Sequence, residues 1–221
     1  MTVSVDTGSV EGVARLTVAG DRSRADTLAD IGVALADVEA DDRIRVVLLA
    51  LPDGLRSVPD DGRPIDLTVL LRWRNLRKLT IAAVSGTVST LALAVAWTCD
   101  LIVAAEGTEF VDLDGAESVP VLLAHAHELG PRRAKQLMLT GGRLSAAEAV
   151  EIGMVTKMFP ADTFEAANVA FAERVAGLPS VTGLLIKDSV NQAVDNMGYE
   201  NAVRHAAAIW HQAGLDGSEH R

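Results

Sequence analysis

Three short apolar runs, each separated from the next by a stretch with helical patterning, constrain the fold of this chain more than any other feature. They span residues 45–51 (RVVLLAL), 79–84 (LTIAAV) and 101–104 (LIVA). An uninterrupted apolar run of this length is typical of a strand covered on both faces, because a strand with one wet face alternates apolar and polar residues. Such strands alternating with helices predict an α/β fold with a parallel sheet.

The rest of the chain supplies one alternating strand and a series of helices. Val13–Val18 alternates apolar and polar side chains, which predicts a strand. Apolar residues recur at helical spacing over Thr27–Ala40, and Asp26 is placed to cap this helix. Ser145 and Glu148 form the S-x-x-E pattern of a capping box. Further helices are expected at 65–77, 90–97, 132–139, 161–177, 181–194 and 199–214, and residues 51–64 are expected to form a loop.

Charge and cysteine content exclude several classes of protein. The 221 residues carry a formal net charge of −10 with no basic stripe, whereas nucleic-acid binding needs clustered Lys and Arg to neutralise phosphates. The single cysteine, Cys99, excludes a disulfide framework and a cysteine-based zinc site, and we interpret it as a small buried apolar residue. The N-terminus lacks the pattern of a signal peptide, and the longest apolar stretch, 91–105, is too short to cross a bilayer. We therefore expect a cytoplasmic protein.

Two longer stretches carry a resemblance to a known family. Residues 78–110 read KLTIAAVSGTVSTLALAVAWTCDLIVAAEGTEF, and residues 134–160 read AKQLMLTGGRLSAAEAVEIGMVTKMFP. The order of strand, Gly turn, small-residue helix, Cys-Asp, strand and Ala-Ala, then Leu-Thr-Gly, Ser-Ala-x-Glu-Ala and Gly-Met-Val, resembles the enoyl-CoA hydratase/isomerase, or crotonase, superfamily. Weaker similarity covers the N-terminal strand, residues 24–28 and residues 46–49, so the resemblance spans most of the chain.

This resemblance implies a fold, a ligand and an assembly. It implies a crotonase-like spiral core of β-β-α turns over residues 1–160 and a helical C-terminal trimerisation region over 161–221, truncated relative to the family. Members bind acyl-CoA thioesters, act in fatty acid metabolism and commonly form homotrimers or hexamers. Two backbone N–H groups stabilise the enolate-like oxyanion of the thioester, and carboxylates move protons at the neighbouring carbons. We expect no metal, no membrane or nucleic-acid partner, and no cofactor besides the coenzyme A of the substrate.

By the same resemblance, the two backbone donors of the oxyanion hole fall on Val58 and Leu91. The family's Gly-rich turn corresponds to residues 90–92 (TLA), so Leu91 would be strained if that turn needs positive φ, and its side chain would meet the thioester. The other donor loop corresponds to residues 56–61 (RSVPDD), in which Pro59 forces Val58 toward an extended backbone.

The catalytic carboxylates of the family are only partly matched. Where hydratases carry one glutamate this chain has Ala94, which cannot accept or deliver a proton. The position of the second glutamate falls on Asp114, within residues 110–117 (FVDLDGAE). Asp112 and Asp114 would share one face of an extended segment, where mutual repulsion raises one pKa enough for acid–base work. The competing interpretation is a solvated acidic loop.

The region expected to hold the coenzyme A phosphates contains Arg22 and Arg24, which match basic residues of the family near the first helix. The family's Pro-Gly-x-Gly-Gly loop is replaced by residues 120–123 (PVLL), and His125 and His127 follow it. Two residues apart on a helix, these imidazoles point to different sides, so a metal pair is not expected.

Two functions remain open at this point. One is an acyl-CoA enzyme, of the isomerase type or another type that uses a single carboxylate, with Asp114 or Asp112 as the acid/base. The other is a catalytically inactive member that binds an acyl thioester or serves as a partner subunit. An unrelated hydrolase or redox protein finds no support, because the sequence contains no Ser/His/Asp spacing, dinucleotide turn or metal cluster.

Overall fold

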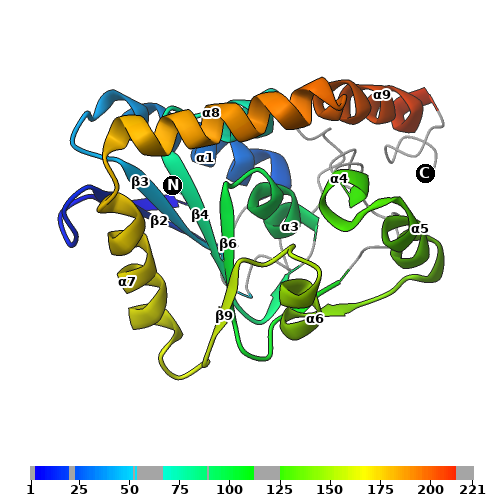
Figure 1. Cartoon of the computed structure of the whole chain (residues 1–221), viewed down its shortest axis with the longest axis horizontal. Coiled ribbons are helices and arrows are strands. Elements are labelled where there is room, and N and C mark those ends of the chain that lie inside the picture. Colours follow the sequence, from blue (N-terminus) through cyan, green and yellow to red (C-terminus); the bar gives the residue numbers. More distant parts are fainter. Residues whose placement is uncertain are drawn as a thin grey trace.

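A six-stranded sheet forms the centre of the computed structural model, which describes residues 3–19, 23–51, 53, 67–88, 90–111 and 125–212 (Figure 1). The strand order is β1-β2-β3-β4-β6-β9; β1 is antiparallel to β2, and all other neighbours are parallel. A second sheet has the order β5-β7-β8. The strands are β1 (Val3–Asp6), β2 (Val13–Val18), β3 (Val46–Leu51), β4 (Leu79–Val84), β5 (Thr87–Val88), β6 (Leu101–Ala105), β7 (Glu109–Phe110), β8 (Leu144–Ser145) and β9 (Lys157–Phe159).

Helices cover both faces of the larger sheet. In Figure 1, α7 lies on one side of the strands and α3 on the other. α8 and α9 run nearly end to end, and α8 crosses the ends at which β4 and β6 begin. The helices are α1 (Arg24–Ala40), α2 (Leu67–Arg74), α3 (Thr90–Trp97), α4 (His125–Leu129), α5 (Pro131–Thr140), α6 (Ala146–Glu151), α7 (Phe164–Ala176), α8 (Ser180–Asn196) and α9 (Tyr199–Gln212).

The central strand β3 confirms the prediction of strands buried on both faces. Its alternate residues Val47 and Leu49 belong to the core that contains α1 and α3, whereas Val46 and Leu48 belong to the core that contains α7. All four side chains are buried, because successive residues of a strand point to opposite faces and both faces here are covered.

Consecutive β-β-α units build the centre of the fold. β4, β5 and α3 form one unit, and β6 and β7 open the next. The first strands of the two units pair in parallel in the larger sheet, with Ile81 opposite Leu101, and the second strands pair in parallel in the smaller sheet, with Thr87 opposite Glu109. Successive units therefore stack in register, and the predicted spiral of β-β-α turns is present.

Most helix positions agree with the sequence, and one predicted cap is wrong. The capping box is confirmed: Ser145 Oγ accepts the Glu148 N–H at 3.3 Å, and Glu148 accepts the Ser145 N–H at 2.9 Å. The first helix, in contrast, is capped by Ser23, whose Oγ accepts the Asp26 N–H at 3.2 Å. Asp26 lies inside the first turn instead, where its negative charge suits the positive end of the helix dipole.

Five strands of the structure were not predicted from the sequence. β1 is a four-residue strand at one edge of the larger sheet, and β5, β7, β8 and β9 each have only two or three residues. A segment this short shows no period of apolar residues, so its pairing depends on the neighbouring strands.

Among the described residues, no single helix combines the length and apolar composition needed to cross a membrane. α7 and α8 would meet that test together, but they are bent by 98° at their junction. Within the same residues, no group of three or more His, Cys, Asp or Glu side chains is placed to hold a metal ion.

Candidate functional site

The first turn of α3 lies at the carboxyl ends of the central strands. α3 connects β4 to β6, which are parallel, so the helix runs opposite to the strands and begins at the edge where β3 and β4 end (Figure 1). The N–H groups of a first helical turn have no acceptor within the helix. Together with the helix dipole they favour negative charge, as at an oxyanion.

Leu91, the expected second oxyanion donor, is the second residue of α3. Its backbone is helical, and helical φ is negative, so the strain expected for a turn with positive φ is absent. Its side chain is 2% exposed and belongs to the main core. The strain inferred from the loss of glycine is therefore corrected, whereas the expected contact of the side chain with a thioester stays a prediction; the Leu91 N–H lies in the first turn, whose amides have no acceptor within the helix.

Ala94 occupies the same face of α3 one turn later. Its side chain is 1% exposed, and the neighbouring residues 91–97 are buried around the whole helix. No carboxylate is carried by α3, whose sequence is TLALAVAW. Any acid–base group must therefore come from another segment.

The structure places only some of the predicted site residues. Asp112, Asp114, Val58 and Arg22 lie outside the described residues. Arg24 opens α1, but only its backbone is described. The geometry of a carboxylate pair and of a coenzyme A contact therefore remains a prediction from the sequence.

Asp53 is a residue of this edge that the sequence analysis missed. It follows the end of β3 by two residues, and its Oδ1 accepts the Thr87 N–H of β5 at 2.7 Å. It also lies against Gly86, where an added Cβ would come within 2.7 Å of the Asp53 Cβ. An aspartate directly after a buried strand was the available signal, because short carboxylates often accept backbone N–H groups at turns.

A cavity of about 540 Å³ lies at the other end of α3. Its lining includes Trp97 and Cys99 but neither Leu91 nor Ala94, so it is separate from the first turn of the helix. Apolar side chains of β4, β6, α7, α8 and the link between these two helices contribute to its walls; they are Leu79, Leu101, Val175, Leu178, Ile186, Val190 and Val194.

The two cations that line this cavity are each paired with a carboxylate. Lys187 Nζ lies 3.0 Å from Asp100 Oδ2, and Arg74 Nη1 lies 3.0 Å from Asp195 Oδ1. Among the described lining residues, the charges of both cations are therefore neutralised locally.

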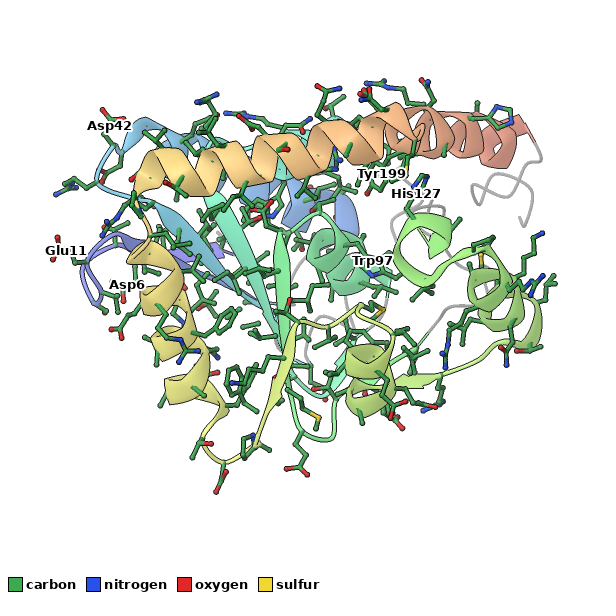
Figure 2. All side chains as sticks on the ribbon, viewed as in Figure 1. Asp6, Glu11, Asp42, Trp97, His127 and Tyr199 are labelled. Atoms are coloured by element: carbon green, nitrogen blue, oxygen red, sulfur yellow. The ribbon has the colours of Figure 1, made fainter. Side chains whose placement is uncertain are left out.

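An aromatic cluster closes one end of the cavity. Figure 2 shows Trp97, His127 and Tyr199 gathered between α3, α4 and α9. The rings of His127 and Tyr199 meet edge to face with centroids 5.2 Å apart, and the Arg74 guanidinium lies 4.5 Å from the centroid of the Tyr199 ring. His127 therefore packs against an aromatic ring, and it belongs to no group of possible metal ligands among the described residues. The side chain of His125 lies outside the described part of the structure.

Cys99 is an inert thiol in this setting. Burial raises its pKa from 9.0 to about 12, although its Sγ accepts the Trp73 Nε1–H at 3.0 Å. At neutral pH the group is therefore a protonated thiol, which is a poor nucleophile. The interpretation of Cys99 as a packing residue agrees with its place beside the main core.

Comparison with known proteins agrees with this geometry. The family model described as "Enoyl-CoA hydratase/isomerase" matches residues 61–214. The "Putative enoyl-CoA hydratase EchA13" of Mycobacterium tuberculosis is 49% identical over 135 residues, which are 60% of this chain and 42% of that protein. The "Putative enoyl-CoA hydratase" of Thermus thermophilus is 31% identical over 79% of this chain and 76% of its own length. The chain spans about half the length of most curated relatives it matches.

A solved structure extends the likeness over nearly the whole chain. The crystal structure of a "probable enoyl-COA hydratase" from Mycobacterium thermoresistibile superposes with a TM-score of 0.83 and 28% identity, covering 99% of this chain and 98% of that one. The β-β-α spiral, the residues matched by the family model and the named relatives all indicate the same family. This chain belongs to the enoyl-CoA hydratase/isomerase family.

Proposed function

We propose that this protein binds an acyl-CoA thioester with the acyl carbonyl at the first turn of α3. The supporting observation is the helical backbone of Leu91, whose N–H lies in the first turn of α3 and has no acceptor within the helix, while its side chain is buried in the core. A backbone donor of this kind polarises the thioester and favours the enolate-like state, because the dipoles point at the oxygen before charge develops. Val58 is the second proposed donor, and Arg22 and Arg24 are the proposed contacts of the coenzyme A phosphates.

If the protein is an enzyme, its reaction uses a single carboxylate. The hydration mechanism that uses two glutamates is disfavoured, because Ala94 is buried and has no ionisable group that could give or take a proton. We propose Asp114, or its neighbour Asp112, as the acid/base that removes and returns a proton beside the thioester, as in an isomerisation. Both reactant and product then remain thioesters of coenzyme A, and no other cofactor is required.

The second candidate is a member that binds the thioester without turning it over, or that serves as a partner subunit. The observation that favours it is the run of buried apolar side chains over residues 91–97 of α3, which packs as a core helix and carries no ionisable side chain. In this case ligand binding persists while activity is absent.

We further propose a homotrimer or hexamer located in the cytoplasm. Support for the assembly comes from α8 and its C-cap residue, where large apolar side chains are exposed in the single chain; they are Val181, Leu185, Ile186, Val190 and Met197. Contiguous apolar surface of this kind usually marks a contact with another protein.

Isothermal calorimetry with coenzyme A and a series of saturated acyl-CoAs tests the binding proposal. Micromolar affinity that strengthens with acyl length is the expected result, because each added methylene buries apolar area. Absence of binding at millimolar ligand would overturn the proposal and would direct the search toward protein partners.

Asp114→Asn and Asp112→Asn, made separately, distinguish the enzyme from the inactive binder and show which of the two carboxylates acts. Loss of isomerisation with unchanged acyl-CoA affinity supports Asp114 as the acid/base. Unchanged activity in Asp114→Asn excludes that role, and wild-type protein that binds but never turns over a panel of enoyl-CoAs establishes the inactive binder.

A further inference from the structure

Asp53 connects the two sheets of the fold at a single point. The side chain comes from the carboxyl end of the larger sheet, because β3 ends at Leu51. Its Oδ1 accepts the N–H of Thr87, the first residue of β5 in the smaller sheet, at 2.7 Å. The last residue pair between β3 and β4 is Leu51 with Val84. Asp53 and Gly86 each lie two residues beyond that pair, which brings them opposite one another.

Gly86 makes this contact close. Its φ is +69°, a conformation that favours glycine, and an added Cβ would lie 2.7 Å from both Cβ and Cγ of Asp53. The Gly86 carbonyl also accepts the N–H of Glu109 at 2.9 Å. The turn between β4 and β5 is therefore held by Asp53 on one side and by β7 on the other.

Three segments that meet at this turn lead along the chain to residues of the proposed site. β5 leads within two residues to the first turn of α3 and Leu91, whereas β7 ends at Phe110, directly before the segment of Asp112 and Asp114. The chain after Asp53 leads toward Val58. β5 has only two residues, so its own ladder supplies little rigidity, and an additional acceptor has a large share in setting its position.

We propose that Asp53 is a positioning residue for the oxyanion hole, acting through the Thr87 N–H to set the place of the Leu91 amide. The inference rests on the proposed binding of an acyl carbonyl at α3. In this role Asp53 neither contacts the acyl-CoA nor takes part in proton transfer. It requires only an acceptor oxygen, so asparagine in its place retains the function and alanine does not.

The test uses an acyl-CoA labelled with ¹³C at the thioester carbonyl, whose infrared stretch moves to lower frequency when the oxygen accepts hydrogen bonds. The variants are Asp53→Ala and Asp53→Asn. Asp6→Ala is the matched control, because Asp6 is also exposed and accepts the Gly8 N–H at 2.9 Å in a turn at the far edge of the sheet (Figure 2). Thermal unfolding checks that each variant folds, and Asp53→Leu, which has a branched side chain without an acceptor oxygen, replaces the alanine variant if that protein does not fold.

In Asp53→Ala we expect at least half of the carbonyl shift to be lost and acyl-CoA affinity to fall about tenfold, with the affinity for free coenzyme A within twofold of wild type. Free coenzyme A has no acyl carbonyl, so a general loss of structure would weaken both ligands equally. Asp53→Asn and Asp6→Ala should retain the wild-type shift.

The outcomes distinguish this proposal from the proposed function. A wild-type shift that Asp53→Ala retains in full overturns the positioning role alone. Equal weakening of both ligands in Asp53→Ala also overturns it, because the residue then supports the fold in general. Wild-type protein that binds acyl-CoA without any carbonyl shift overturns the oxyanion hole, and the role of Asp53 with it.

Discussion

Lys187 of α8 donates a hydrogen bond to Asp100, the residue just before β6, with 3.0 Å between Nζ and Oδ2. The lysine also donates to the Lys78 carbonyl at 3.0 Å, and its side chain is only 3% exposed. The same Asp100 oxygen accepts the Thr80 N–H at 2.7 Å. One carboxylate therefore joins α8 to the starts of both β4 and β6, and it satisfies the charge of a buried lysine.

Lys187→Met should lower the free energy of unfolding by about 3 kcal/mol, because it leaves Asp100 without its counter-ion in a mostly buried position. Urea denaturation measures the change. Lys135→Met, at an exposed position of α5, is the control and should stay within about 0.5 kcal/mol of wild type. In a double-mutant cycle with Asp100→Asn the two losses should be less than additive, and simple additivity would contradict the pairing.

Hydration of a short 2-enoyl-CoA should be absent or far below the turnover of about 10 per second that is ordinary for an enzyme. The reason is Ala94, which replaces one of the two proton-transferring groups with a buried methyl. The loss of absorbance of the conjugated thioester measures the rate, with an active hydratase as positive control. Ordinary turnover would show that another group performs the task assigned to the missing glutamate.

Ala94→Glu should destabilise the fold rather than simply supply the missing group. A carboxylate at a position 1% exposed loses its hydration without a described partner, at a cost of about 2 kcal/mol or more. Ala147→Glu, at an exposed position of α6, is the matched control and should change stability little. Equal unfolding curves for the two variants would mean that the surroundings of Ala94 admit water.

Stability should decrease as pH rises above about 9, because the unfolded chain then releases the Cys99 proton while the folded chain retains it up to about pH 12. The contribution is fully present below the unfolded pKa and is lost as pH approaches the folded one. Between pH 7.5 and pH 10 the loss of stability amounts to about 1.4 kcal/mol. Urea denaturation of wild type and Cys99→Ala at both pH values isolates it, and identical pH dependence in the two proteins would refute the raised pKa.

Leu185→Glu should reduce a homotrimer to monomers of 23.3 kDa, because it places a charge among the exposed apolar side chains of α8. Light scattering after size-exclusion chromatography gives the mass. Val33→Glu, which changes a half-exposed apolar residue of α1, should leave the assembly intact. A wild-type protein that is already monomeric at micromolar concentration would exclude this interface.

The sequence alone predicted the long elements and the family. The strands over 13–18, 79–84 and 101–104 and the helix over 90–97 agree with the structure to within a residue, because each has a clear apolar period or run. The strand pairs of the smaller sheet could not be predicted, since two residues contain no period. The cap of α1 was assigned to Asp26 instead of Ser23, a shift of three residues that helical periodicity does not resolve.

For the site, the sequence determined what chemistry is missing, and the tertiary structure decided which part of the framework remains usable. The loss of acid–base chemistry at Ala94 follows from residue type alone, because a methyl side chain has no ionisable group. Whether Leu91 is strained depended on its backbone conformation, and only the tertiary structure showed that this backbone is helical and that the side chain is buried in the core. The contact between Asp53 and Thr87 joins residues 34 apart in the chain, so it arises from the stacking of two sheets and has no local pattern in the sequence.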